Sequence, residues 1–143
     1  MFWDTSALVP LLVEEARSGA LRSLYKQDGQ MTVWWASAVE CASAIARLER
    51  EGRLSVAGVR QALEKLDRLR GEWNEFHPSE ELRATAIRFV RVHPLRAADA
   101  LQLASAFLDA EGRPSSLEFV SLDERLCEAA QREGFPLPIL NRS

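Results

Sequence analysis

Short apolar runs alternate along the chain with longer segments in which apolar residues recur at helical spacing. Residues 1–3 and 31–35 are apolar, aromatic or β-branched, and a helical pattern follows each of these runs. Further short apolar runs occupy residues 73–76, 117–120 and 137–140. Together the runs predict a sheet of about five short strands.

The segments between the runs predict amphipathic helices. In residues 37–51, apolar side chains repeat at helical spacing until Gly52 ends the pattern. Ser37 and Glu40 have the spacing of a capping box, in which each side chain accepts a hydrogen bond from the other residue's backbone N–H. Helices are expected over about residues 7–13, 18–26, 37–51, 55–72, 79–93, 96–111 and 123–132.

This alternation of strands and helices predicts an α/β fold, with a mostly parallel sheet covered by helices on both faces. A chain of 143 residues, 47% of them hydrophobic, is long enough for one buried core, so residues 1–143 are expected to form a single domain. Parallel sheets carry their functional sites at the carboxyl ends of the strands. The residues that follow each strand are therefore the ones to search for chemistry.

The composition argues against several classes of protein. No apolar stretch approaches the roughly 20 residues of a membrane-spanning helix. Residues 1–4 lack the pattern of a secretory signal, so a cytoplasmic protein without a membrane segment is expected. Cys41 and Cys127 have no zinc-site spacing and are expected to be buried thiols. The net charge of −3 argues against a general nucleic-acid coat, but an enzyme that gathers carboxylates around a metal can be acidic overall.

Four acidic residues stand where such a sheet would carry its chemistry. Two follow predicted strands and two lie in the first turns of predicted helices: Asp4, Asp123, Glu40 and Asp99. Taken singly, each has a structural explanation as a helix cap or as a charge at the positive end of a helix dipole. Taken together, they would converge on one cleft, where several ionised carboxylates need a cation to offset their repulsion.

A cluster of this kind predicts a metal site that handles phosphate. Oxygen ligands suit Mg²⁺ or Mn²⁺, which keep several waters and bind phosphate oxygens. Such ions can activate a water and offset the charge that develops in phosphodiester hydrolysis. Two other phosphate-handling classes fit less well. A haloacid-dehalogenase type requires a second Asp where Ser6 stands, and a receiver-type phosphoacceptor requires a lysine later than Lys65.

Four sequence blocks resemble those of PIN domains, most closely the VapC toxins of VapBC toxin–antitoxin pairs. The blocks come in the family's order and span the chain from about residue 1 to residue 140. They are Asp4-Thr5-Ser6-Ala7-Leu8, Glu40 with Ala42-Ser43-Ala44-Ile45-Ala46-Arg47, Arg96-Ala97-Ala98-Asp99-Ala100-Leu101-Gln102-Leu103-Ala104, and Val120-Ser121-Leu122-Asp123-Glu124-Arg125-Leu126. The resemblance implies a three-layer α/β/α PIN-like fold.

The resemblance also implies an activity and a set of partners. It makes the four acids the catalytic, metal-binding residues of an endoribonuclease that hydrolyses RNA with a water activated by Mg²⁺ or Mn²⁺. Ser6 and Ser121 occupy family positions for a hydroxyl that supports an acid, the metal's water or the substrate phosphate, although helix or turn capping also explains a serine there. The implied partners are an RNA such as tRNA, a VapB-like antitoxin and a second copy of the chain.

Several other residues are candidates for contact with RNA. Arg96 precedes Asp99 and offers a planar fork to phosphate oxygens. Trp34 and Trp35 are adjacent in a predicted strand, so one should enter the core while the other serves packing, an interface or base stacking. Six further arginines form either a basic rim or ordinary solvated helix faces: Arg47, Arg50, Arg53, Arg60, Arg68 and Arg70.

The sequence leaves two functional classes open. The first is a ribonuclease, either a toxin or a housekeeping enzyme of the same fold. The second is a non-cleaving PIN-like module that binds RNA or a protein partner. The presence of all four acids favours the enzyme, and the small size of the chain disfavours a DNA or flap nuclease.

Overall fold

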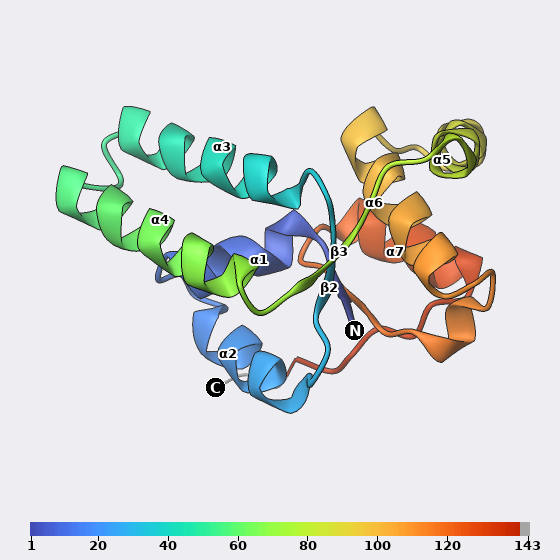
Figure 1. Cartoon of the computed structure of the whole chain (residues 1–143), viewed down its shortest axis with the longest axis horizontal. Coiled ribbons are helices and arrows are strands. Elements are labelled where there is room, and N and C mark those ends of the chain that lie inside the picture. The colour runs from blue at the N-terminus through green and yellow to red at the C-terminus, as the bar shows by residue number, and fades with distance from the viewer. Residues whose placement is uncertain (141–143) are drawn as a thin grey trace.

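A parallel sheet lies between two layers of helices in the computed structural model, which describes residues 1–140 (Figure 1). The strands are β1 (Phe2–Trp3), β2 (Thr32–Trp34), β3 (Asn74–Phe76) and β4 (Phe119–Val120). The helices are α1 (Thr5–Leu12), α2 (Ser18–Gln27), α3 (Ser37–Arg50), α4 (Val56–Arg70), α5 (Glu80–Val92), α6 (Ala97–Asp109) and α7 (Glu124–Glu133), with a short 3-10 helix, η1 (Pro114–Ser116), before β4. The predicted α/β class and three-layer arrangement are confirmed. In the described residues, no helix is both long and apolar enough to cross a membrane.

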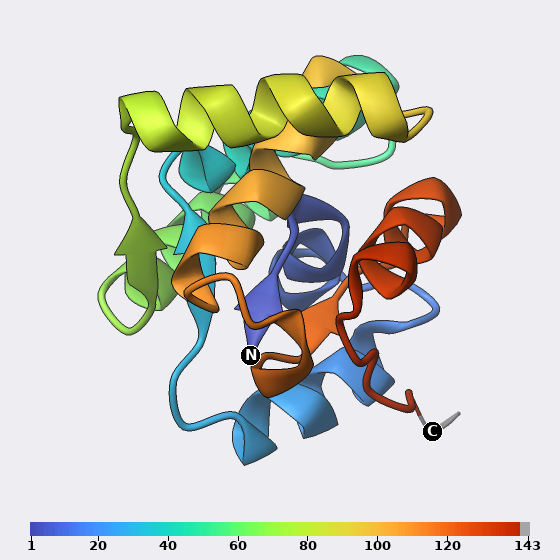
Figure 2. The same ribbon diagram turned by 90° about the vertical axis from the view of Figure 1, so that its right-hand side faces the viewer.

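The two layers of helices enclose separate cores on the two faces of the sheet. Successive strand residues point to opposite faces. Phe2 therefore packs under α5, α6 and α7, whereas Trp3 packs against α1 to α4. Figure 2 views the α5–α7 layer from its outer side. Because both faces are covered, β1 and β4 are apolar and buried throughout, whereas the edge strand β3 carries the polar residues Asn74 and Glu75. Each fully buried aromatic side chain contributes about 2–3 kcal/mol of stability.

The adjacent tryptophans at the end of β2 divide between core and surface, as strand alternation predicts. Trp34 is 6% exposed and belongs to the α5–α7 core, while Trp35 is 50% exposed just beyond the strand. The two rings meet edge to face, with their centroids 6.4 Å apart. Trp35 is thus available for a surface contact, and Trp34 is not.

The predicted strand at residues 137–140 is wrong. The sheet has the four strands β1 to β4, and residues 137–140 adopt no regular structure. The backbone N–H of Phe119 donates a hydrogen bond of 3.0 Å to the carbonyl of Pro136, so this segment begins beside β4. Pro136 and Pro138 have no N–H to donate in return, which prevents a regular ladder.

The predicted capping box at the start of α3 is also wrong. Ser37 is the first residue of the helix, the N-cap is Ala36, and no side chain caps that position. The Ser37 hydroxyl is buried and accepts a hydrogen bond of 3.2 Å from Gln102 of α6. A tertiary contact has therefore replaced the local one that the Ser-x-x-Glu spacing suggested.

The strand order β3-β2-β1-β4 determines where the functional site lies. The chain moves from β1 to β2 and on to β3, and then returns to place β4 on the other side of β1. In open parallel sheets, ligands bind beyond the carboxyl ends of the strands at such a reversal of order. The reversal lies between β1 and β4, whose carboxyl ends lead to Asp4 and Asp123.

Candidate active site

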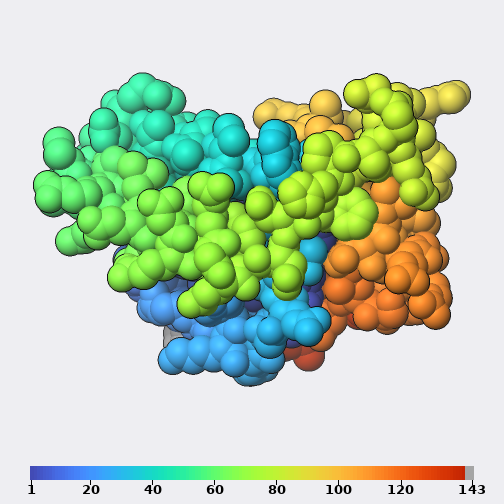
Figure 3. All heavy atoms as spheres, in the orientation of Figure 1, coloured from blue at the N-terminus to red at the C-terminus, as the bar shows by residue number. Residues whose placement is uncertain are grey.

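An open cleft of about 1400 Å³ lies at the carboxyl edge of the sheet. In Figure 1, the first turns of α1, α3, α6 and α7 surround this edge. In Figure 3 the α3–α4 hairpin projects to one side and α5 with α6 to the other. The cleft is lined by all four predicted acids, Asp4, Glu40, Asp99 and Asp123, and also by Ser6 and Arg96. Each of the four acids lies on, or directly precedes, a different helix.

Asp4 is the most buried of these acids. It ends β1 and caps α1, and only 4% of the residue is exposed. One carboxylate oxygen accepts a hydrogen bond from the backbone N–H of Ser6 at 2.8 Å, and the other accepts one from the Ser6 hydroxyl at 2.8 Å. Burial raises the pKa of Asp4 to about 6, although hydrogen bonds from Ser121 and Ser6 act in the opposite direction. The nearby charge of Asp123 adds to the rise.

The turns after β1 and β4 are joined through two serine hydroxyls. The Ser6 Oγ lies 3.2 Å from the Ser121 Oγ and accepts a hydrogen bond of 2.8 Å from the backbone N–H of Leu122. The Ser121 Oγ accepts a hydrogen bond of 3.0 Å from the backbone N–H of Asp123. Asp123 in turn caps α7 by accepting from the backbone N–H of Leu126 at 3.1 Å. This network fixes the backbone on both sides of the acid pair.

Glu40 lies in the first turn of α3 and is held by α6. Its Oε1 accepts a hydrogen bond of 3.1 Å from the Nε2 of Gln102. Burial raises the pKa of Glu40 to about 7, and the charge of Asp4 contributes further. The Gln102 hydrogen bond favours the ionised form but does not reverse the shift.

Asp99 lies in the first turn of α6, and Arg96 is the exposed N-cap residue of the same helix. Burial raises the pKa of Asp99, and the charge of Asp123 raises it further. The guanidinium of Arg96 acts in the opposite direction. Arg96 is therefore close enough to Asp99 for its charge to favour the ionised carboxylate.

The acids influence one another around the cleft without forming a closed cage. The charge of Asp4 raises the pKa of Glu40, and that of Asp123 raises the pKa of Asp99. Within residues 1–140, no three Asp, Glu, His or Cys side chains are arranged closely enough to hold a metal ion by themselves. The structure thus brings the predicted acids to one cleft and leaves space between them.

Comparison with known proteins connects this cleft to a family. The sequence model of the PIN domain matches residues 1–132. The chain belongs to the PIN-domain family. The resemblance seen in the four sequence blocks is thereby confirmed. No curated protein sequence matches the chain.

Several solved structures share the fold of this PIN domain over nearly their whole length. VapC20 from Mycobacterium tuberculosis, a toxin that cleaves the sarcin-ricin loop, aligns with a TM-score of 0.69 at 19% identity, covering 99% of this chain and 98% of that chain. FitAcB from Neisseria gonorrhoeae aligns with a TM-score of 0.65 at 16% identity, covering 99% and 96%. A toxin–antitoxin complex from Klebsiella pneumoniae aligns with a TM-score of 0.60 at 16% identity, covering 99% and 98%.

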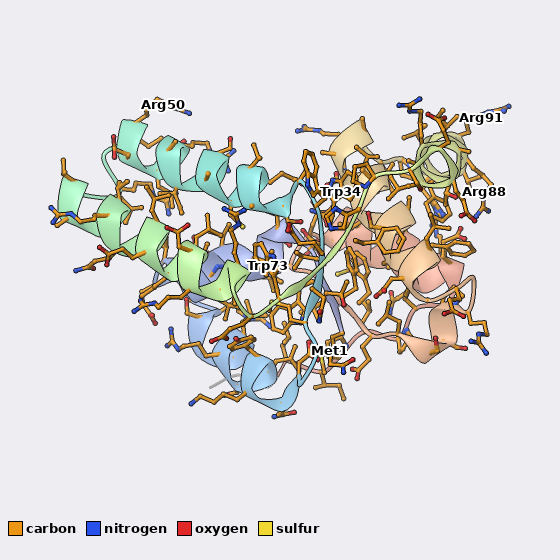
Figure 4. The ribbon with its side chains drawn as sticks, viewed as in Figure 1. Met1, Trp34, Arg50, Trp73, Arg88 and Arg91 are labelled. Carbon is orange, nitrogen blue, oxygen red and sulfur yellow. The ribbon has the colours of Figure 1, made fainter. Side chains whose placement is uncertain are left out.

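Only some of the candidate arginines of this PIN domain reach the cleft. Four arginines line it, all of them exposed: Arg47, Arg53, Arg96 and Arg125. Figure 4 shows Arg50 at the outer end of α3, and Arg88 and Arg91 on α5 at the opposite side of the molecule. The remaining candidates do not belong to the described lining: Arg50, Arg60, Arg68 and Arg70. Arg47 and Arg53 therefore stay candidates for RNA contact, together with Arg96.

Sequence reasoning gave no role to two polar residues that the PIN fold places beside the acids. Gln102 is 1% exposed and donates to Glu40, and Thr5 accepts from Gln102 at 3.0 Å. Arg125, on the first turn of α7, was likewise not singled out. A signal for Gln102 was present, because a glutamine three residues after Asp99 on an otherwise apolar helix shares that residue's face.

Proposed function

We propose that this PIN domain is a metal-dependent endoribonuclease and the toxin of a toxin–antitoxin pair. One observation carries the proposal: four acids from four separate elements line the same open cleft, namely Asp4, Glu40, Asp99 and Asp123. Helix capping explains individual acids, but it does not require that all of them face the same cleft. Raised pKa values at three of these carboxyls are a further mark of a functional site: Asp4, Glu40 and Asp99.

The donor set fits Mg²⁺ or Mn²⁺. Carboxylate oxygens are the ligands that hard divalent cations prefer, and Mg²⁺ usually takes one or two carboxylates and completes its shell with waters and substrate phosphate. An open cleft without a ready-made cage suits that mode of binding. Bound between the acids, the cation would offset their mutual repulsion and favour the ionised forms of Asp4 and Glu40. The chemistry that it would supply is Lewis acidity and a lowered pKa of a bound water.

The protein's own residues position the reaction. The Ser6 and Ser121 hydroxyls keep Asp4 and Asp123 in place on either side of the β1–β4 reversal. The guanidinium groups of Arg96 and Arg125 line the cleft and would bind phosphates that flank the bond to be cut. Hydrolysis would form a bond between the water oxygen and phosphorus and break the bond from phosphorus to the sugar oxygen, which would leave with the bonding electron pair and take up a proton from solvent water. A cleft carboxylate receives the proton of the attacking water.

The proposed partners are RNA, an antitoxin and a second copy of the chain. The sarcin-ricin loop specificity of VapC20 supports structured RNA as the substrate, and the toxin–antitoxin complex from Klebsiella pneumoniae supports a small antitoxin as the inhibitor. A homodimer is proposed from the family resemblance. Exposed Trp35 and Val39 at the start of α3 offer apolar surface for one of these protein contacts.

Cleavage of pooled RNA by purified protein tests the proposal. The wild-type chain, Asp4→Asn and Asp99→Asn are compared in Mg²⁺, in Mn²⁺ and in EDTA. Asp109→Asn is the matched control, because Asp109 also lies on α6 but does not line the cleft. We expect discrete cuts from the wild type and from the control, and none from the cleft variants or in EDTA.

The alternative function is a PIN-like module that binds RNA or protein without cutting it. Intact RNA from folded, inhibitor-free protein under every metal condition would favour this alternative. Cleavage that Asp4→Asn retains would instead indicate a contaminating nuclease. Discovery of an antitoxin gene product that binds the chain and blocks its cuts would separate a toxin from a housekeeping ribonuclease.

A further inference from the structure

One buried glutamine connects three of the elements that build the cleft. Gln102 of α6 is 1% exposed, and its Nε2 lies within hydrogen-bond distance of three oxygens. These are the Thr5 Oγ1 on α1 at 3.0 Å, the Ser37 Oγ on α3 at 3.2 Å and the Glu40 Oε1 on α3 at 3.1 Å. Asp99 lies three residues earlier on the same face of α6. The amide is therefore placed directly behind the acids, out of contact with solvent.

The contact with Glu40 fixes the orientation of this amide. If its carbonyl oxygen took the place of Nε2, it would face the carboxylate of Glu40 at about hydrogen-bond distance with no proton between the two acceptors. With Nε2 toward Glu40, the amide donates to the carboxylate and shares its second proton between the hydroxyls of Thr5 and Ser37. The donor side of Gln102 thus serves the cleft.

The acceptor side of the same amide is left without a partner. Gln102 Oε1 is buried and makes no hydrogen bond within the described part of the chain. A buried carbonyl without a donor destabilises the folded state, and an apolar side chain of the same shape avoids that cost. If the side chain at position 102 only filled space in the core, methionine would fill it equally well. The hydrogen-bond donors of Gln102 are the feature that methionine lacks.

We propose that Gln102 is a positioning residue for Glu40. By holding Oε1 from behind, the amide turns the other carboxylate oxygen toward the cleft, where the remaining acids lie. Residues that hydrogen-bond to a metal ligand orient it, and their loss typically weakens metal binding about 10- to 100-fold. This inference rests on the proposed function, because it requires that Glu40 contact the divalent cation.

Calorimetric titration of the full chain with Mn²⁺ alone tests the role of Gln102. We expect the folded Gln102→Met variant to bind Mn²⁺ at least about tenfold more weakly than the wild type. Ser105→Ala is the matched control, because Ser105 is also fully buried on α6 but donates only to the carbonyl of Leu101, away from the acids. That control should bind Mn²⁺ as the wild type does. Gln102→Leu provides the same comparison if the methionine variant does not fold.

A double-mutant cycle with Glu40 separates positioning from packing. If Gln102 acts through Glu40, Gln102→Met weakens Mn²⁺ binding in the wild-type background but adds no loss in a Glu40→Gln background. Equal losses in both backgrounds, or unchanged binding by Gln102→Met, would overturn the inference while leaving the proposed function intact. If the wild type does not bind Mn²⁺ and does not cut RNA, the proposed function itself fails, and the inference fails with it.

Discussion

The hydroxyl oxygens of Ser6 and Ser121 lie 3.2 Å apart, and this contact joins the turn after β1 to the turn after β4. Each hydroxyl also accepts a hydrogen bond from a backbone N–H near Asp123. The Ser6 hydroxyl donates to Asp4 in addition. A pair of small polar side chains therefore links the two acids that flank the reversal of strand order.

Replacing Ser6 with alanine should reduce both stability and activity. The change leaves the backbone N–H of Leu122 and one oxygen of Asp4 without their partner, and a buried group that loses its partner costs about 1–3 kcal/mol. Urea denaturation measures this loss, and cleavage of RNA measures the effect on Asp4. Ser43→Ala is the control, because Ser43 is an exposed residue of the same cleft. Equal stability of the two variants would contradict the role given to the Ser6 hydroxyl.

The metal-free protein should lose stability as the pH rises through the range in which Asp4 ionises. The pKa of Asp4 is about 6 in the folded protein and 3.8 ordinarily, so the unfolded chain loses its proton first and is favoured as the pH increases. Between about pH 4 and pH 6, the free energy of unfolding should fall by up to about 3 kcal/mol from this group. Above about pH 6 its contribution is constant.

Asp4→Asn should flatten this dependence, because the amide does not titrate. The slope that remains should come from Glu40, whose pKa is also raised, to about 7, although Asp4→Asn removes the part of that rise that the Asp4 charge causes. Denaturation in EDTA at a series of pH values makes the comparison. Mn²⁺ should restore stability to the wild type at neutral pH and much less to Asp4→Asn, since binding to the folded state alone stabilises it. A wild-type stability that rises over about pH 4 to 6 in EDTA would contradict the burial of Asp4 as the dominant effect.

Arginines of the cleft should contribute to RNA binding through phosphate contacts. In an Asp4→Asn background, which prevents cleavage, Arg96→Ala or Arg125→Ala should weaken RNA binding at low salt and reduce the slope of log affinity against log salt by about 1. Arg50→Ala is the matched control, because Arg50 lies at the outer end of α3 (Figure 4). Filter binding across a salt series gives these slopes. Equal slopes for the three variants would place the RNA elsewhere.

Asp28 should support stability without contributing to catalysis. Its two oxygens accept from the N-terminal ammonium group of Met1 at 3.1 Å and from the indole N–H of Trp3 at 2.8 Å. Asp28→Ala should lower the free energy of unfolding by about 2–3 kcal/mol, and Asp28→Asn by less, because the amide oxygen still accepts one bond. Thermal denaturation measures the stability. RNA cleavage per folded molecule should be unchanged, since Asp28 does not line the cleft.

The position of the four acids at one edge of the sheet was predictable because two simple rules determine it. A residue that follows a parallel strand, or that begins the next helix, lies at the carboxyl edge of the sheet whatever the details of packing. Asp4 and Asp123 follow the first rule, and Glu40 and Asp99 follow the second. Alternation along a strand similarly predicted that Trp34 and Trp35 would part, one to the core and one to the surface.

The errors arise where a distant residue competes with a local pattern. Ser37 and Glu40 have capping-box spacing, but both side chains accept hydrogen bonds from Gln102 instead. Gln102 lies on α6, and two helices, α4 and α5, separate it from α3 in the sequence. Spacing alone contains no information about that competitor. The same limit explains why Gln102 received no role, since a buried amide has meaning only once its partners are known. The false strand at residues 137–140 had a local warning, because prolines interrupt it.

The pairing of β1 with β4 has a consequence for the order in which the protein is made. Ser6 and Ser121 are separated by 115 positions, so the contact between their turns forms after nearly all of the chain has been synthesised. A ribosome adds about 5–20 residues per second. Once Asp99 has been added, the growing chain contains Asp4, Glu40 and Asp99, but it still lacks β4, the strand that completes the carboxyl edge of the sheet beside β1. Translation products that stop before β4 carry no complete acid cleft, so the architecture ties the proposed nuclease activity to full-length synthesis.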